Sequence, residues 1–284
     1  MAKKVIVVTG VTSGIGKALA TGLAKTGEGV VLVARDAERG NRIEQEIKSQ
    51  TQNADIELVL SDLSSLSSVR NTAVVIKSKH ENIDVLINSA AVYKQRREVN
   101  TDGFERMFVT NHLGPFLLTH LLLEPLLTSG SARILNLTAP STVELDFDNL
   151  QGENYFNSLR AFGATKMMNM LFTFELARRL QNTGVTVNAI HPGLARSSLM
   201  NESGAIMRFL LRLAAAPAER VAVDIIRVAL DPEFEKVTGR FLHKAKEIEA
   251  PAYARDRQAQ KRLWEISSNL AGVSDVDIPA RLTM

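Results

Sequence analysis

The stretch Thr9-Gly10-Val11-Thr12-Ser13-Gly14-Ile15-Gly16 directly follows the apolar run Val5-Ile6-Val7-Val8. Four consecutive β-branched residues indicate a strand that is buried on both faces, and helical spacing of apolar residues follows from Ile15 to Leu23. The glycines therefore lie where a strand turns sharply into a helix. Bare backbone at such a turn lets a pyrophosphate approach the helix N-terminus, where free N–H groups and the helix dipole hold an anion. The stretch predicts a dinucleotide site formed by Gly10, Thr12, Ser13, Gly14, Ile15 and Gly16, with a ligand-free glycine turn as the alternative.

The alternation of short apolar runs and longer amphipathic stretches continues along the chain. Further strands are expected at residues 30–33, 56–60, 83–87, 134–137, 185–190 and 240–243. Helices are expected at residues 36–50, 64–79, 104–127 with a kink at Gly114-Pro115, 159–180, 217–230 and 252–270. Strands separated by helices at this rhythm predict a doubly wound sheet. We therefore expect an α/β fold, a single Rossmann-like domain over residues 1–284 with a seven-stranded parallel sheet flanked by helices.

The composition excludes several classes of function. The 284 residues include no Cys, which rules out disulfides, a Cys zinc site and a Cys nucleophile. The 34 Lys and Arg exceed the 31 Asp and Glu by three, too few for a nucleic-acid surface. The richest apolar run, Leu113–Leu127, falls short of the roughly 20 residues that span a membrane. No metal-ligand spacing is evident. We expect a cytoplasmic protein with no metal, no nucleic-acid partner and no membrane partner.

The glycine spacing G-x-x-x-G-x-G resembles that of the short-chain dehydrogenase/reductase family, and the resemblance extends over residues 4 to 200. Residues 101–105, 116–119 and 175–180 look like the retinol-dehydrogenase-like branch of this family. The resemblance implies further cofactor contacts, namely Asp62, Leu63, Asn88, Lys166, Pro192, Gly193 and Ser197. It also implies that Asn111 belongs to the catalytic group.

The residues after the second strand predict which cofactor binds. A carboxylate there would accept hydrogen bonds from the ribose 2′-hydroxyl of NAD and repel a 2′-phosphate. This sequence has Ala34 followed by Arg35, whose guanidinium suits a phosphate. The adjacent Asp36 is interpreted as the cap of the following helix. We expect NADP(H), the alternative being that Arg35 is a solvated surface charge.

The resemblance fails at the residues that move a proton. Members of the family usually have a Tyr four residues before a Lys, and both side chains then face one cleft. Here Phe162 precedes Lys166, and Ala139 stands where the family has a Ser that polarises the substrate carbonyl. Phe cannot donate a proton, and a positioned general acid contributes typically about 10²–10⁴ in rate. Of the usual catalytic group, Asn111 and Lys166 remain.

Two hydroxyl groups are candidate substitutes for the missing ones. Tyr93 follows the fourth strand, and Ser141 could reach the cleft if the end of the fifth strand bulges, although it could equally be a loop residue. His112 and His191 are interpreted as packed histidines. The apolar segment 194–216 either covers a bulky substrate or packs on the core.

The sequence thus predicts an atypical NADP(H)-dependent oxidoreductase acting on a bulky apolar ketone, activated alkene or iminium. A non-redox cyclase or isomerase, and a protein that senses NADP(H) without turnover, are the alternatives. In the relatives that the sequence resembles, the two long helices pair across a two-fold axis, which implies a homodimer here.

Overall fold

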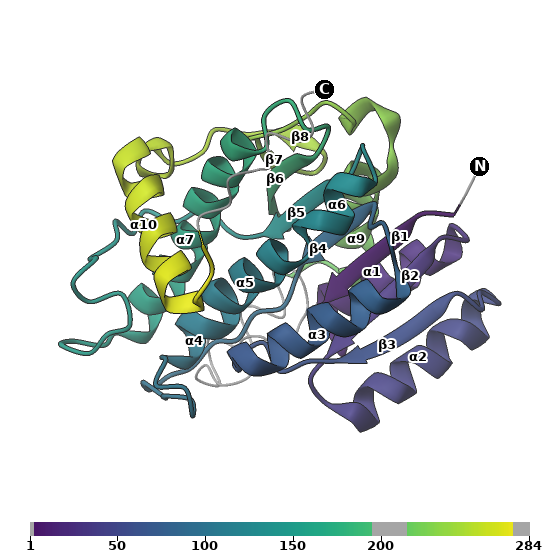
Figure 1. Cartoon of the computed structure of the whole chain (residues 1–284), viewed down its shortest axis with the longest axis horizontal. Coiled ribbons are helices and arrows are strands. Elements are labelled where there is room, and N and C mark those ends of the chain that lie inside the picture. Colours follow the sequence, from purple (N-terminus) through teal and green to yellow (C-terminus); the bar gives the residue numbers. More distant parts are fainter. Residues whose placement is uncertain (1–2, 195–214, 275–284) are drawn as a thin grey trace.

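The computed structural model describes residues 3–194 and 215–274, and within these ranges one sheet organises the chain (Figure 1). Its strand order is β3-β2-β1-β4-β5-β6-β7-β8. The bounds are β1 Val5–Thr9, β2 Gly29–Ala34, β3 Ile56–Leu60, β4 Val85–Asn88, β5 Arg133–Leu137, β6 Thr186–His191, β7 Phe241–His243 and β8 Lys246–Glu247. The doubly wound α/β class is confirmed, because all pairs from β3 to β7 are parallel.

The predicted number of seven strands is wrong, because a short eighth strand closes one edge of the sheet. β8 pairs with β7 in the antiparallel direction. The turn between them places Lys244 at φ 51° and Ala245 at φ 54°. Tight hairpins of this kind usually have Asn or Gly at such positions, so Lys-Ala gave no sequence signal for a hairpin.

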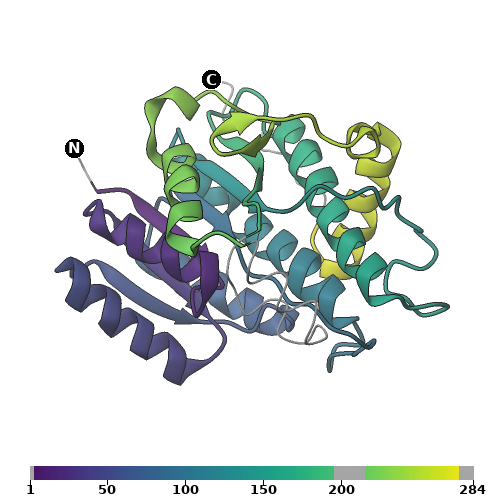
Figure 2. The same ribbon diagram turned by 180° about the vertical axis from the view of Figure 1, so that it is seen from behind.

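Helices cover both faces of the sheet (Figures 1 and 2). A hydrophobic cluster lies on each face of the sheet. One packs between the sheet and the helices α1 (Gly14–Lys25), α2 (Ala37–Thr51) and α9 (Ala218–Leu230). The other lies under α3 (Leu66–Lys79), α5 (Gly114–Leu121), α7 (Ser158–Arg179) and α10 (Arg257–Ala271). Parallel strands buried on both faces explain the continuous apolar runs in the sequence. None of the helices in the described ranges is long and apolar enough to cross a membrane.

The long helix expected at residues 104–127 is divided into shorter pieces. α4 (Arg106–Phe108) continues into a π-helical turn, η1 (Val109–Leu113), then α5, and α6 (Leu123–Thr128) follows a break at Leu122. The expected kink at Gly114-Pro115 stays a prediction; Pro115 lies in the first turn of α5, directly after the π-helical turn, and both features are places where helices bend. Gly114 passes close to another segment, because a Cβ there would lie 2.3 Å from the carbonyl oxygen of Leu63.

Helix α10 covers the two helices that were expected to form a dimer. The Trp264 ring packs against Phe116 and Phe172, with centroid distances of 5.1 and 6.1 Å, and the Arg179 guanidinium lies 4.2 Å from the Trp264 centroid. Met168, Leu171 and Phe172 are buried within the single chain. This face is therefore not available for the two-fold pairing expected from the sequence, and a dimer would have to form through another surface.

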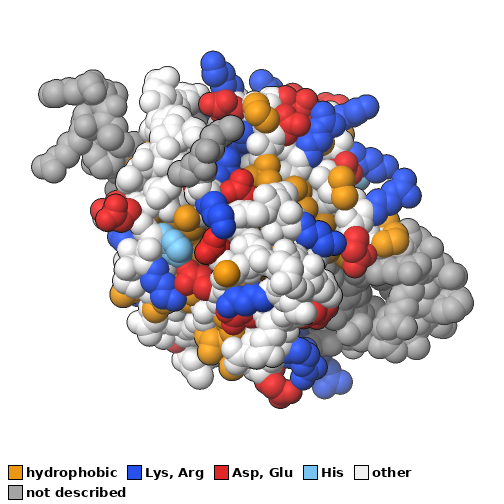
Figure 3. All heavy atoms as spheres, turned by 90° about the vertical axis from the view of Figure 1, so that its right-hand side faces the viewer, with side chains coloured by type: hydrophobic (Ala, Val, Ile, Leu, Met, Phe, Trp, Pro, Cys, Tyr) orange, Lys and Arg blue, Asp and Glu red, His pale blue; other side chains and the backbone are white. Residues whose placement is uncertain are grey.

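Charges of both signs are mixed on the side of the molecule where β3 lies. Figure 3 shows Lys and Arg side chains interspersed with Asp and Glu, and hydrophobic side chains scattered between them. A surface of this kind is an ordinary solvated face rather than a field of one sign.

Candidate active site

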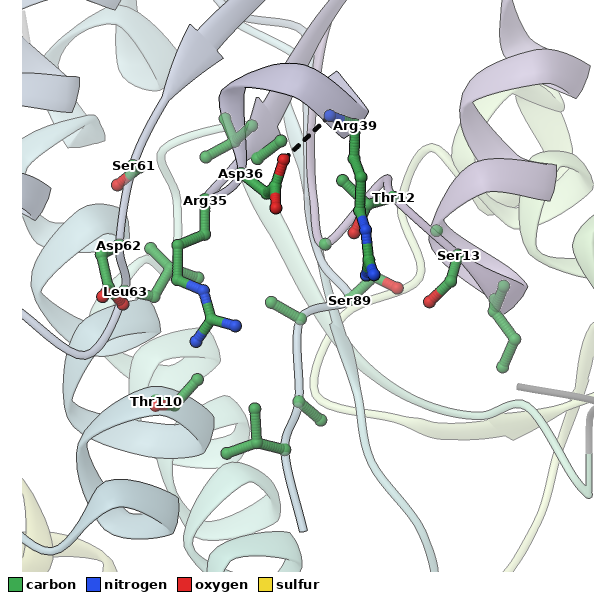
Figure 4. Close-up of a pocket in the computed structure, with 18 of the residues that line it drawn as sticks. Thr12, Ser13, Arg35, Asp36, Arg39, Ser61, Asp62, Leu63, Ser89 and Thr110 are labelled. Carbon is green, nitrogen blue, oxygen red and sulfur yellow. Dashed lines mark hydrogen bonds between the residues drawn. The ribbon is translucent and has the colours of Figure 1, made fainter. Parts of the chain in front are cut away.

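A cleft of about 560 Å³ opens at the carboxyl ends of β1, β2, β3 and β4. In a doubly wound sheet this is the edge where ligands bind. Most residues predicted to bind the cofactor line it together, namely Gly10, Thr12, Ser13, Ile15, Gly16, Arg35, Asp62 and Leu63 (Figure 4). Of the other predicted residues, Gly14 opens α1 beside the cleft. Ser197 lies outside the described residues.

The turn between β1 and α1 leaves no room for side chains at Gly10 and Gly16. Gly10 has φ +75°, and a Cβ there would lie 2.7 Å from the Cα of Ala90. A Cβ on Gly16 would lie 2.2 Å from the carbonyl oxygen of Gly10. Helix α1 has no acidic residue in its first turn. The helix N-terminus therefore faces the cleft with its N–H groups and positive dipole end unopposed by a carboxylate, as a pyrophosphate requires.

Two guanidinium groups enter the cleft at the end of β2. Figure 4 shows Arg35, which directly follows β2, and Arg39, in the first turn of α2, directed into the same hollow. The Asp36 carboxylate between them accepts a hydrogen bond from the Arg39 N–H at 2.9 Å, so it caps α2 as expected. Neither arginine has an ion-pair partner in the part of the chain that the structure describes. The sequence reasoning missed Arg39, although its position one helical turn after Arg35 could have indicated it.

The predicted residue Asn88 lies behind the cleft rather than in its lining. Its Nδ2 donates to Thr119 Oγ1 at 3.0 Å and to Asn136 Oδ1 at 2.8 Å, and the side chain is buried. The loop after β4 is held instead by Thr9, whose Oγ1 accepts from the N–H groups of Ser89 and Ala90 at 3.0 and 3.2 Å. Sequence reasoning also missed Thr9, because the contact depends on the pairing of β1 with β4.

Asn111 positions the same loop from the π-helical turn. Its Oδ1 accepts from the Val92 N–H at 2.7 Å, and its Nδ2 donates to the Val92 carbonyl at 2.9 Å. These two bonds fix the backbone immediately before Tyr93, which lines the cleft. π-Helical turns occur frequently at functional sites, and here the turn aims the amide at the loop.

The side chains of Lys166, Phe162 and Tyr93 contact one another in that order, and Tyr93 is the member of the three that lines the cleft. Lys166 Nζ lies 4.8 Å from the Phe162 ring centroid, one turn earlier on α7. The Phe162 ring meets the Tyr93 ring edge-on, with centroids 5.7 Å apart. Tyr93 Oη donates to Ser158 Oγ at 3.0 Å. Burial lowers the pKa of Lys166 from 10.5 to about 8, because the charged form loses its hydration.

The hydroxyl groups after β5 bind the backbone of α7. Thr138 Oγ1 donates to the Lys166 carbonyl at 2.7 Å, and Ser141 Oγ donates to the Gly163 carbonyl at 2.9 Å. Ser141 Oγ also accepts from the Val143 N–H at 3.2 Å. Ser141 is thus buried and occupied by backbone groups, so in this arrangement it orients the helix.

The end of β6 contributes to a separate hollow. Pro192 and Gly193 line it together with His191, whose ring stacks on His243 at a centroid distance of 4.7 Å. The other expected packed histidine, His112, is buried and its Nε2 lies 2.8 Å from Ser267 Oγ. No group of three or more His, Asp or Glu that could hold a metal lies in residues 3–194 and 215–274.

Comparisons with known proteins agree with this architecture. A family model described as short chain dehydrogenase matches residues 4–206. The chain is 37% identical to retinol dehydrogenase 12 of Mus musculus over 275 residues, covering 95% of this chain and 87% of the relative. It is 38% identical to retinol dehydrogenase 11 of Homo sapiens over 274 residues, covering 95% and 86%. A crystal structure of an uncharacterised protein from Mycobacterium Paratuberculosis is similar with a TM-score of 0.77 at 27% identity, covering 96% and 95%.

Proposed function

Because the chain belongs to the short chain dehydrogenase family, we propose that it is an oxidoreductase that uses NADP(H) and works without the usual tyrosine proton donor. Its substrate would be a bulky apolar ketone, activated alkene or iminium. The names of the relatives, retinol dehydrogenases, support an apolar substrate. In the proposal the whole chain forms one domain and the protein is cytoplasmic. The segment 194–216, expected from the sequence to cover the substrate, lies almost entirely outside the described residues.

The residues of the cleft fit a dinucleotide with a 2′-phosphate. The side-chain-free surface at Gly10 and Gly16 makes room for a pyrophosphate at the start of α1. Arg35 and Arg39 would hold the 2′-phosphate, since both line the cleft and the Asp36 carboxylate between them caps α2. A bound nicotinamide supplies a hydride acceptor or donor. Lys166 would contact the nicotinamide ribose, and Asn111 would hold the cleft wall at Val92.

The observation that supports atypical chemistry best is the ring of Phe162 beside Lys166 Nζ. By its spacing and its place on α7, Phe162 stands where the family has its acid, and Ala139 stands where the family has its serine. Neither Phe162 nor Ala139 has a hydroxyl group, so neither side chain can donate a proton or a hydrogen bond to a carbonyl oxygen. A substrate that is already cationic, or an alkene activated by a neighbouring group, needs less proton donation at the step of hydride transfer.

The proposal is tested by restoring the two hydroxyl groups. In the variant Phe162→Tyr/Ala139→Ser, the phenol would lie one turn from Lys166, whose positive charge lowers the pKa of a tyrosine. We expect at least about 10²-fold faster NADPH-dependent reduction of apolar ketones than in the unmodified protein, and little change in NADPH affinity. The assay follows loss of NADPH absorbance with a panel of ketones, activated alkenes and iminium salts. The single variant Phe162→Tyr is the control for the contribution of the serine.

Three outcomes would decide between this proposal and its rivals. Fast ketone reduction by the unmodified protein would mean that another group, with Tyr93 the first to test as Tyr93→Phe, donates the proton. Product formation without NADPH consumption would indicate a cyclase or isomerase. Tight NADPH binding without turnover in either protein would indicate a sensor.

A further inference from the structure

A second hollow, of about 510 Å³, lies at the edge of the sheet opposite β3. It is enclosed by the end of α7, the strand pair β7–β8 and the start of α10, which lie together in Figure 1. None of its lining residues lines the cofactor cleft. It is lined by four arginines and one acidic residue, namely Arg178, Arg240, Arg255, Arg257 and Glu247.

Two of these arginines form ion pairs within the protein. Arg178 Nε donates to the buried carboxylate of Glu175 at 3.1 Å, and Arg240 lies 3.1 Å from Glu247. Glu247, the acidic residue of the lining, is therefore already paired with Arg240 and does not pair with the other arginines of the hollow.

The other two arginines, Arg255 and Arg257, have no ion-pair partner in the described ranges. They flank Asp256, whose carboxylate is already used, because it accepts from the N–H groups of Gln258 and Ala259 at 2.8 and 3.1 Å. The chain therefore places at one hollow two guanidinium groups that form no ion pair in the described ranges. Guanidinium groups bind phosphate and carboxylate oxygens in a two-pronged geometry.

A buried amide gives a second, independent indication of a ligand. Gln260 lines the hollow and is only 3% exposed. Its Nε2 donates to the Ala254 carbonyl at 2.8 Å, which fixes the orientation of the amide and leaves Oε1 with no partner in the described structure. Buried acceptors are rarely left unpaired, so an O–H or N–H group is expected to reach this oxygen.

We propose that this hollow binds a phosphomonoester that carries a neighbouring hydroxyl group. Arg255 and Arg257 bind the phosphate, Arg240 and Arg178 shape the wall, and Gln260 Oε1 accepts from the hydroxyl. The site is separate from the cofactor cleft and does not depend on the reaction proposed there.

Calorimetric titration of the full chain with glycerol 3-phosphate tests this site. The variant Arg255→Gln/Arg257→Gln should bind at least about tenfold more weakly than the unmodified protein, because two charge-assisted contacts are lost. Lys261→Gln, which removes a cation from the same helix outside the hollow, should bind as the unmodified protein does. The double variant leaves Arg35 and Arg39 of the cofactor cleft unchanged, so its loss of affinity for glycerol 3-phosphate measures binding at this hollow.

A further variant and two other probes test the hydroxyl contact. Gln260→Met should lose the preference for glycerol 3-phosphate over inorganic phosphate. Vesicles of phosphatidylcholine with phosphatidic acid test whether the phosphomonoester is a lipid headgroup; binding of vesicles alone, lost in the double arginine variant, would assign the site to a lipid. Equal affinity in the double variant and the unmodified protein would overturn the proposal. So would an equal loss in Lys261→Gln, or no binding of either probe.

Discussion

Replacement of Lys166 by methionine is expected to stabilise the folded protein at neutral pH. Burial lowers the pKa of this lysine from 10.5 to about 8, so the folded state holds its proton less tightly than the unfolded chain does. The difference corresponds to about 3 kcal/mol, at about 1.4 kcal/mol per pH unit. Lys→Met removes this cost of burying a charge and retains most of the apolar stem.

The contact with Phe162 reduces the expected gain. Nζ lies 4.8 Å from the ring centroid, and a desolvated cation–π contact contributes about 0.5–2 kcal/mol. The net increase in the free energy of unfolding at pH 7 should therefore be about 1–3 kcal/mol.

The pH dependence has a definite sign. Between pH 8 and 10.5 the unfolded chain binds more protons at this site than the folded chain, so the lysine causes the free energy of unfolding to rise with pH. Below pH 8 the full cost is present, and above pH 10.5 it is absent. The variant lacks this rise, so its advantage over the unmodified protein should shrink from pH 8 to pH 10.

Urea denaturation of both proteins at pH 7, 8, 9 and 10 measures this difference. The comparison cancels the other lysines and tyrosines that titrate in the same range. A variant less stable than the unmodified protein at pH 7, or a stability difference independent of pH, would refute the reasoning. If the methionine variant is more stable at pH 7, the protein retains a buried charge at a cost in stability, as expected of a functional residue.

Further predictions concern the cofactor cleft and the two layers of the core. Gly16→Ala should abolish NADPH binding in calorimetry while the protein still unfolds cooperatively, because the new Cβ would lie 2.2 Å from the carbonyl of Gly10. Arg35→Ser should lower the affinity for NADPH by about 10-fold to 100-fold, and leave that for NADH unchanged, if the guanidinium binds the 2′-phosphate. Trp264→Ala should lower the free energy of unfolding by about 3–5 kcal/mol in urea titrations, since the indole is buried between α10 and the helices α5 and α7. Burial lowers the pKa of His112 to about 4, so stability should fall as pH drops from 6.5 towards 4, and His112→Gln should flatten that loss in acid unfolding curves.

Local sequence patterns predicted the parts of this fold that depend on local backbone chemistry. Strand β1, the glycine turn after it and helix α1 were predicted from residues close together in the sequence, and so was the Asp36 cap of α2. The β7–β8 turn at Lys244 and Ala245 could not be predicted, because its backbone conformation is imposed by strand pairing rather than by residue type.

The same division applies to the candidate site. Arg35 and the glycines were found from their spacing. The contacts of Tyr93 with Phe162 and of Thr9 with the loop after β4 join segments far apart in the sequence, so no local pattern contains them. Asn88 was named from its motif position, and its side chain bonds Thr119 and Asn136, a contact that joins three separate segments; its role in cofactor binding stays a prediction.

The packing of α10 on α5 and α7 has a consequence for biosynthesis. Phe116 and Phe172 emerge from the ribosome well before Trp264, the residue that covers them. At about 5–20 residues per second, the interval between Phe116 and Trp264 is on the order of ten seconds. During that time the nascent helical layer presents uncovered aromatic surface, the kind of surface that makes folding intermediates prone to aggregate. Docking of α10 therefore acts as a late step of folding, and truncated nascent chains that lack α10 should be more prone to aggregate than those that contain it.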